Sequence, residues 1–245
     1  MADSPAQEEA PESEASAVDE AAAPDQSELS GVDGSARDGT DVPAGEAAGP
    51  TPVPDAGYLF FDDFEQGATG YWRTADSNDA GAPDSDWSVF VGDTGSVYSE
   101  VSLDNNEWHI TYASSGAVSD QIVEAKMRVV EFYDSTPSYV AALFARYDPS
   151  SDSGYFVALR GDGSLIIRKR VQGKNASWAA GVDAGIVQGA WHVVRLEVLG
   201  NTASAFLDGN LVYSAVDSAP LAAGTAALGT YGATIEVDSI FLAQP

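Results

Sequence analysis

Trp191–Leu199 reads Trp-His-Val-Val-Arg-Leu-Glu-Val-Leu, the clearest β-strand pattern in the sequence. Successive side chains of a β-strand point to opposite faces. The even positions from His192 to Val198 therefore share one face, which is mostly apolar, and the odd positions from Trp191 to Glu197 share the other. Such alternation is typical of a half-buried strand. One face packs in a core, and the other is available as a working surface.

Two Asp-Gly pairs mark tight turns, one within Arg160–Ser164 and one within Leu207–Asn210. Asp-Gly between alternating runs is the strongest local hairpin signal, so the strands on either side are antiparallel neighbours. Further runs of this kind recur about every ten residues, and no window has a helical period, which indicates an all-β sandwich. The predicted strands are Tyr58–Phe64, Trp87–Phe90, Ser96–Glu100, Glu107–Tyr112, Gln121–Val130, Tyr139–Tyr147, Gly154–Arg160, Leu165–Val171, Trp191–Leu199, Thr202–Leu207, Asn210–Ala215, Gly224–Tyr231 and Ile235–Leu242.

Residues 1–57 differ in composition from the rest of the chain. All 24 aromatic residues lie at or after Tyr58, whereas residues 1–57 hold seven of the twelve prolines. They also hold 14 Asp and Glu against one basic residue, Arg37. Such a segment buries too little apolar surface to offset its ordering entropy. We predict a disordered acidic tail or linker over residues 1–57 and one domain over residues 58–245.

The charge of the chain argues against several classes of partner. The net charge is −27, and residues 58–245 alone carry 24 acidic and 10 basic side chains. Nucleic acid is excluded as a partner because its phosphates would meet a surface of the same sign. The sequence contains no apolar run of 18 residues, so it does not predict a helix that inserts into a membrane. The sequence has no cysteine, so it forms no disulfide and no thiolate metal site.

Short segments with a fixed order and spacing span nearly all of residues 58–245. They are Phe61–Gly67, Trp72, Asp86–Val89, Ala142–Tyr147, Gly154–Arg160, Gly189–Val198, Ala205–Gly209, Ala222–Tyr231 and Val237–Ile240. Together they resemble the laminin-G/concanavalin A-like modules appended to bacterial pectate lyases and other polysaccharide-degrading enzymes. The resemblance implies a jelly-roll β-sandwich of two antiparallel sheets that is usually non-catalytic and holds polysaccharide near an enzyme. No lyase domain accompanies it here, so the partner enzyme would be a separate chain.

A catalytic reading of the same fold lacks an essential residue. The fold is similar to that of glycoside hydrolases of the laminarinase type. These enzymes carry a Glu-x-Asp-x-x-Glu motif on one strand, and its carboxylates flank the scissile bond. The segment Glu236–Phe241 supplies Glu236 and Asp238, but Phe241 occupies the position of the second Glu. The two histidines, His109 and His192, are too few for a triad or a histidine metal site. We therefore predict that the chain is not an enzyme.

The resemblance also implies a calcium site. Concanavalin A-like sandwiches often bind one Ca²⁺ with oxygen ligands where the first and last strands meet. The matching positions are Asp63 and Glu65, which share one face of the first strand, and Asp238 on the last. The alternative is that Asp62 and Asp63 merely protect a sheet edge and cap a turn.

Basic residues are concentrated in one part of the chain. Nine of the eleven lie between positions 126 and 195. Guanidinium groups pair with carboxylates through two hydrogen bonds, and aromatic faces stack on sugar rings. Such a site would bind acidic glycans built from uronates. The alternative is that the basic side chains are scattered and neutralise acidic neighbours. The predicted ligand-binding residues, on one concave face, are Arg146, Tyr147, Tyr155, Arg160, Trp178 and Arg195.

Four tryptophans begin or lie within strand patterns. They are Trp72, Trp87, Trp108 and Trp191. Large aromatic residues in strands are usually buried. We expect these four in the core rather than in a ligand site.

The predicted function is non-catalytic carbohydrate binding by an exported bacterial protein at the cell surface. A signal or a lipid-bearing lipoprotein leader would then precede Met1, and the acidic tail would act as an extended spacer. Two other classes of function stay open. One is a structural or adhesive surface protein that binds another protein, and the other is a glycoside hydrolase or polysaccharide lyase.

Overall fold

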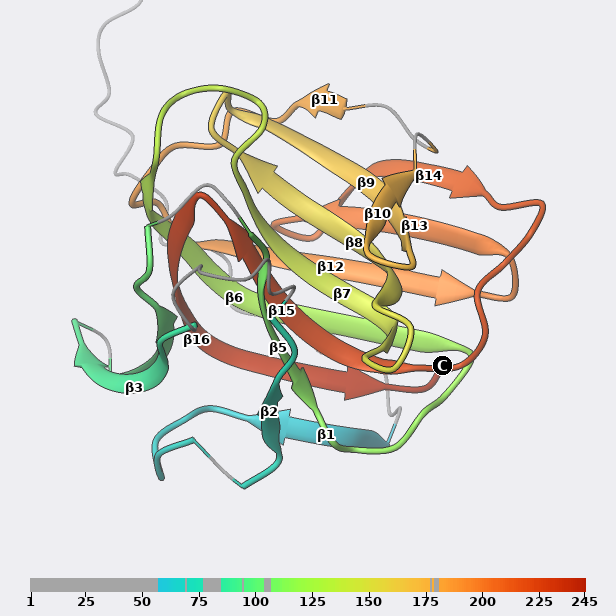
Figure 1. Cartoon of the computed structure of the whole chain (residues 1–245), viewed down its shortest axis with the longest axis horizontal. Helices are drawn as coiled ribbons and strands as arrows, with labels where there is room; N and C mark the ends of the chain where they lie inside the picture. Colours follow the sequence, from blue (N-terminus) through green and yellow to red (C-terminus); the bar gives the residue numbers. More distant parts are fainter. Residues whose placement is uncertain are drawn as a thin grey trace, which may run out of the picture. The chain divides into compact units, whose positions relative to one another are not determined.

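The computed structural model describes residues 57–245 apart from residues 69, 77–84, 94, 104–106, 177, 179 and 180. Within this part all helix and strand elements are β-strands, and they form two antiparallel sheets that pack face to face (Figure 1). No helix long and apolar enough to cross a membrane occurs among the described residues. The predicted all-β sandwich is confirmed. The predicted tail lies outside the described residues apart from Gly57.

The first sheet, sheet A, has eight strands. Its order is β14 (Asn210–Val216), β13 (Thr202–Leu207), β12 (His192–Leu199), β6 (Gln121–Phe132), β16 (Ala233–Ala243), β4 (Gly95–Glu100) and β3 (Trp87–Gly92), and β1 (Tyr58–Asp62) also pairs with β16. The turn between β13 and β14 is Asp208–Gly209, where φ is 49° and 79°. Two successive positive φ angles are what a two-residue hairpin needs, so the predicted Asp-Gly hairpin is confirmed.

The second sheet, sheet B, also has eight strands. Its order is β10 (Lys174–Ala176), β9 (Ser164–Val171), β8 (Ser153–Arg160), β7 (Val140–Asp148), β15 (Thr225–Tyr231), β5 (His109–Ala113) and β2 (Trp72–Thr74), and β11 (Gly181–Asp183) also pairs with β9. The sequence did not predict β2, β10 and β11. Each is only three residues long, which is too short for an alternating pattern to be visible.

The main core lies between the two sheets. Alternate residues of facing strands fill it, such as Val123 and Met127 of β6 and Leu143 of β7, all fully buried. Phe64, Trp72 and Tyr98 add an aromatic group, with ring centroids 5.0–6.0 Å apart. Trp72 is therefore in the core, as predicted.

Sheet B has a second apolar layer on its outer face. The start of β7 reads Val-Ala-Ala-Leu-Phe, so both faces of this strand are apolar. Phe144 on β7 and Phe156 on β8 point outward but are at most 1% exposed, because other side chains of the outer face cover them. A strand that is apolar on both faces needs cover on both faces. The outer face of sheet B is therefore the part of the fold that can form a recess.

Candidate functional site

A groove of about 1000 Å³ lies on the outer face of sheet B. It is formed by β8, β9, β10, the start of β7 and the end of β15, together with the segment just before β5. The lining residues are Glu107, Trp108, Pro137, Ser138, Val140, Phe156, Arg160, Ile166, Arg168, Arg170, Gly173, Lys174, Asn175 and Tyr231. The groove combines apolar side chains with four basic ones, and we call it the basic groove.

Aromatic rings form the floor of the basic groove. Trp108 meets Phe144 and Phe156 edge-on, with centroids 5.8 and 5.4 Å apart. Tyr231 lies 6.1 Å from Trp108 and stacks on Tyr139 at 6.2 Å. The prediction that Trp108 is a core residue therefore needs refinement. It is 7% exposed and belongs to the outer layer that lines the groove, not to the core between the sheets.

The basic wall of the groove comes from β9. Leu165 and Ile167 point into the core, so Arg168 and Arg170 point to the outer face. Arg170 is buried and donates two hydrogen bonds to Asp152, with N–O distances of 2.8 and 2.6 Å. Its guanidinium lies 5.2 Å from the centroid of Trp108. Arg170 is thus held by the protein and fixes the tryptophan.

The other basic side chains of the groove have fewer internal partners. Arg160 donates to the carbonyl of Pro137 at 2.6 Å and lies 4.0 Å from a carboxylate oxygen of Asp162. The side chains of Arg168 and Lys174 make no hydrogen bond or ion pair with any described residue. A guanidinium and an ammonium that line a recess without internal acceptors are free to bind an anionic ligand.

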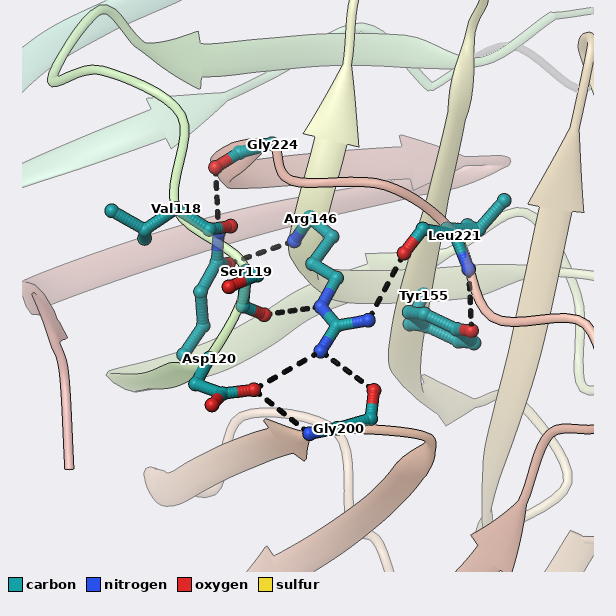
Figure 2. A network of polar contacts seen from close by, with 9 residues as sticks. Val118, Ser119, Asp120, Arg146, Tyr155, Gly200, Leu221 and Gly224 are labelled. Carbon is teal, nitrogen blue, oxygen red and sulfur yellow. Dashed lines mark hydrogen bonds and ion pairs between the residues drawn. The ribbon is translucent and has the colours of Figure 1, made fainter.

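Arg146, one of the predicted ligand residues, is instead a structural residue. It is 3% exposed, and Figure 2 shows its guanidinium among loop carbonyls. It donates to the carbonyls of Ser119, Leu221 and Gly200, the last two at 3.0 and 2.8 Å. Its own N–H donates to Gln121 at 2.8 Å. Its φ of 50° belongs to an irregularity in β7 that turns the side chain away from the outer face.

Tyr155 and Trp178 also lie away from the groove. Tyr155 points into the core, where its hydroxyl donates to Asp217 at 2.7 Å and accepts from the N–H of Leu221. Burial raises the pKa of Tyr155. Trp178 packs against this core, with its ring 5.2 Å from that of Tyr155. The two aromatics thus support the end of the sandwich and do not form an exposed platform.

Arg195 is on the outer face of the other sheet. It donates to Glu124 at 2.7 Å, contacts Glu197 at 3.5 Å, and its guanidinium lies 5.9 Å from the ring of Phe206. Of the six predicted ligand residues, Arg160 lines the basic groove and Tyr147 belongs to the same outer layer. The prediction that all six share one face is therefore wrong. The predicted set also omitted Arg168 and Lys174. The alternation of β9 could have placed Arg168 on the outer face, and the turn after β9 could have placed Lys174 beside it.

The predicted calcium ligands do not come together. Asp238 lies 3.5 Å from Lys126, and Glu65 accepts a hydrogen bond from the N–H of Ser96 at 2.9 Å. Asp63 accepts from the N–H of Glu65 at the turn that follows β1. No group of three His, Asp or Glu side chains in the described part of the chain is arranged to hold a metal ion. The three carboxylates thus do not fit one calcium site, and calcium binding stays a prediction.

The carboxylates that resemble the hydrolase motif lie on the outer face of sheet A, not in the groove. Glu236 accepts from Arg128 at 2.7 Å. Asp238 sits at a register shift between Val237 and Ser239, so it too points outward. Among the described residues that line the basic groove, Glu107 is the one carboxylate.

Comparison with solved structures defines the class of fold as a concanavalin A-like jelly-roll sandwich, as predicted. The carbohydrate-binding module CBM66 from Bacillus subtilis superposes with a TM-score of 0.56 at 19% identity, covering 71% of this chain and 95% of that one. The β-glucanase of Bacillus licheniformis gives 0.55 at 13% identity, covering 76% and 98%. A lichenase from a mouse hindgut metagenome gives 0.55 at 12%, covering 76% and 99%. No protein-family model and no curated protein matches the sequence.

Proposed function

We propose that the chain binds a polysaccharide in the basic groove without cleaving it, and that the polysaccharide carries acidic groups. One observation carries the proposal. Arg168 and Lys174 line a groove with an aromatic floor, and no described residue accepts their hydrogen bonds. Sugar rings stack on aromatic faces, and carboxylates pair with guanidinium groups. The likeness to CBM66 and to glucanases is consistent with glycan binding but concerns the fold alone.

A local basic site is needed because the chain as a whole repels polyanions. Its net charge is −27, so an acidic polymer approaches against the overall field. The four basic residues that line the groove reverse the sign locally, with Glu107 as the one described acidic lining residue. Uronate polymers such as pectin and alginate carry the matching charge.

The absence of catalysis is supported by the carboxylates of the groove. A glycosidase of the usual kind needs two carboxyl groups on either side of the scissile bond, about 5 Å apart in retaining enzymes and further apart in inverting ones. The described lining supplies Glu107 alone. Glu236 and Asp238 are on the opposite face of the sandwich and paired with Arg128 and Lys126.

The proposed setting is the surface of a bacterial cell. There the module would hold polysaccharide for a separate polysaccharide-degrading enzyme. An adhesive role, in which the sandwich binds another protein, is the competing proposal, and a glycan-binding assay separates the two.

Affinity electrophoresis in gels that contain pectin, alginate or a neutral glucan tests the proposal. We expect pectin or alginate to retard the wild type, and added salt to weaken this effect because salt screens charge. Arg168→Ala should reduce the retardation, and Arg168→Lys should also reduce it because an ammonium cannot make the planar two-bond contact. Arg128→Ala, on the other sheet, is the charge-matched control.

Three results would overturn the proposal. They are retardation by neutral glucan alone, retardation by none of the polymers, and equal retardation of Arg168→Ala and wild type. Release of reducing ends from pectin or alginate would show that the chain is an enzyme instead.

A further inference from the structure

A second recess, of about 230 Å³, lies at the other end of the outer layer of sheet B. We call it the tyrosine recess. Its lining residues are Tyr112, Ala113, Ser114, Gly116, Ala117, Tyr147, Asp148, Pro149, Ala223, Gly224 and Thr225. The proposed function assigns it no role.

The same strands connect the two recesses. Val140 at the start of β7 lines the basic groove, and Tyr147 near its end lines the tyrosine recess. Seven residues of extended chain separate them, which is about 23 Å. Trp108, just before β5, lines the basic groove, and Tyr112 near the end of β5 lines the tyrosine recess, about 13 Å further along the chain. The recesses thus lie along one line, at a separation that a chain of several sugar rings spans.

Aromatic rings run without a break from one recess to the other. Trp108 contacts Phe144, Phe144 contacts Tyr147, and Tyr147 contacts Tyr112, with centroids 5.8, 5.4 and 6.1 Å apart. A polar chain follows the same path. The hydroxyl of Tyr147 donates to Asp152 at 3.2 Å, and Asp152 holds Arg170 in the basic groove. The two recesses are thus linked through one packed layer of buried side chains.

The two recesses differ in charge. Four basic residues line the groove, whereas Asp148 is the one charged residue in the described lining of the tyrosine recess. Hydrogen bonds from Ser150 and then Ser151 lower the pKa of Asp148, so it is ionised at neutral pH. Both oxygens of Asp148 already accept hydrogen bonds from Ser150 and Ser151, so Asp148 acts at this recess as a fixed negative charge. Such a charge repels a uronate and leaves a neutral sugar unaffected.

We propose that the tyrosine recess is a second sugar subsite, and that it takes a neutral sugar while the basic groove takes an acidic one. The inference rests on the proposed function and deepens it. The ligand is then an internal stretch of a polysaccharide that combines uronate and neutral units, rather than a uniform polyuronate.

Titration calorimetry with three polymers tests the inference. The probes are hyaluronan, in which uronate alternates with a neutral amino sugar, polygalacturonate, which is all uronate, and a neutral β-glucan. We expect the wild type to bind hyaluronan most tightly. Tyr112→Ala should weaken hyaluronan binding about 2- to 10-fold, the range for one aromatic contact. Asp148→Asn removes the negative charge of the recess, so it should strengthen polygalacturonate binding relative to hyaluronan binding. Tyr58→Ala, at an exposed tyrosine of sheet A, is the matched control and should change neither.

The outcomes separate this inference from the proposed function. If polygalacturonate binds as tightly as hyaluronan, depends on Arg168 and is unaffected by Tyr112→Ala and Asp148→Asn, the second subsite is refuted while the basic groove stands. If neither acidic polymer binds, both are refuted. If Tyr112→Ala also lowers the melting temperature, its weaker binding no longer tests the subsite. The relative affinity of Asp148→Asn for polygalacturonate and hyaluronan then tests it, because that change keeps the size of the side chain.

Discussion

Arg146 and Arg168 belong to the same basic part of the sequence, yet their surroundings are opposite. Arg146 is 3% exposed, and its donors are directed at the carbonyls of Ser119, Gly200 and Leu221 (Figure 2). Arg168 faces the basic groove, where no described residue accepts from it. The first site joins the ends of β6, β7 and β12 to the segment before β15. In the basic groove, the donors of the Arg168 side chain are available to a ligand.

This difference shows that a concentration of charge in the sequence does not identify a binding site. Burying a guanidinium is unfavourable unless every donor has an acceptor, so an arginine with many internal partners stabilises the fold. An arginine in a recess without such partners adds little to stability and is free to bind. The number of internal acceptors therefore distinguishes the two roles, and each prediction below tests that rule.

The largest expected effect is that of Arg146→Ala. This change leaves at least three carbonyls without their donor and Asp120 without its charge partner at 3.4 Å. Each buried acceptor left without its donor typically costs about 1–3 kcal/mol, so the loss of three is on the order of 3–5 kcal/mol after partial rehydration. We expect the free energy of unfolding in urea to fall by that amount. Arg128→Ala removes an arginine that is itself 20% exposed and that pairs with partly exposed Glu236 and exposed Asp93, so it should cost only about 1 kcal/mol. Equal stability of Arg146→Ala and wild type would refute the structural role.

A smaller loss is expected for Asp217→Asn at the same end of the sandwich. Asp217 is 5% exposed, lies 2.7 Å from Lys169, and accepts from Tyr155 at 2.7 Å and from the N–H of Ala219 at 2.9 Å. Burial favours the protonated form, but the hydrogen bonds from Lys169 and Tyr155 outweigh it, so the pKa of Asp217 is lowered. Loss of a hydrogen bond to a charged group costs about 1.5–3 kcal/mol.

The stabilisation by the Asp217 carboxylate should depend on pH in one direction. A carboxylate whose pKa is lower in the folded state stabilises the fold above its unfolded pKa of about 3.9, and the contribution is lost as the pH falls through the folded value. The difference in unfolding free energy between wild type and Asp217→Asn should thus be constant from neutral pH to about pH 5 and shrink below about pH 4. A difference that grows in acid would contradict the assignment.

Variants of the basic groove should change the stability of the fold much less than Arg146→Ala does. Arg168→Ala and Lys174→Ala remove side chains without internal partners, so we expect the free energy of unfolding to change by less than about 0.5 kcal/mol. Urea denaturation of both variants alongside Arg146→Ala measures the contrast on one scale. A loss above about 1 kcal/mol in Arg168→Ala would mean that the arginine supports the fold.

Much of the fold could be predicted from the sequence because alternation and turn chemistry are local. The residues of Trp191–Leu199 specify β12, and the Asp208–Gly209 turn specifies the neighbouring pair β13 and β14. The site was less predictable because irregularities in the strands move side chains between faces. The irregularity between Ala145 and Asp148 places Tyr147 on the outer face, and Arg146 is turned into the loops. No composition or spacing signal marks such a shift.

The distinction between satisfied and unsatisfied arginines also depends on contacts that are remote in sequence. Arg146 meets Leu221, 75 residues away, and Gly200, 54 residues away. Arg168 and Lys174, by contrast, lie on β9 and on the strand after it, so alternation alone places Arg168 on the outer face. What the sequence lacks is the identity of the neighbours across the sheet, which decides whether a basic side chain finds an acceptor.

The smallest expected effect concerns calcium, and it extends the comparison to acidic side chains. Asp238 is 3.5 Å from Lys126, and Glu65 accepts from both the N–H and the hydroxyl of Ser96, so each already has partners within the protein. A cation that binds only the native state raises its stability by mass action. Because binding at these positions would first require existing contacts to break, we expect calcium to raise the melting temperature over that in chelator by a small amount at most. Calorimetric scans of wild type and Asp238→Asn in both buffers measure this. A rise in calcium that Asp238→Asn abolishes would show that the carboxylates rearrange around the ion, and would restore the calcium site predicted from the sequence.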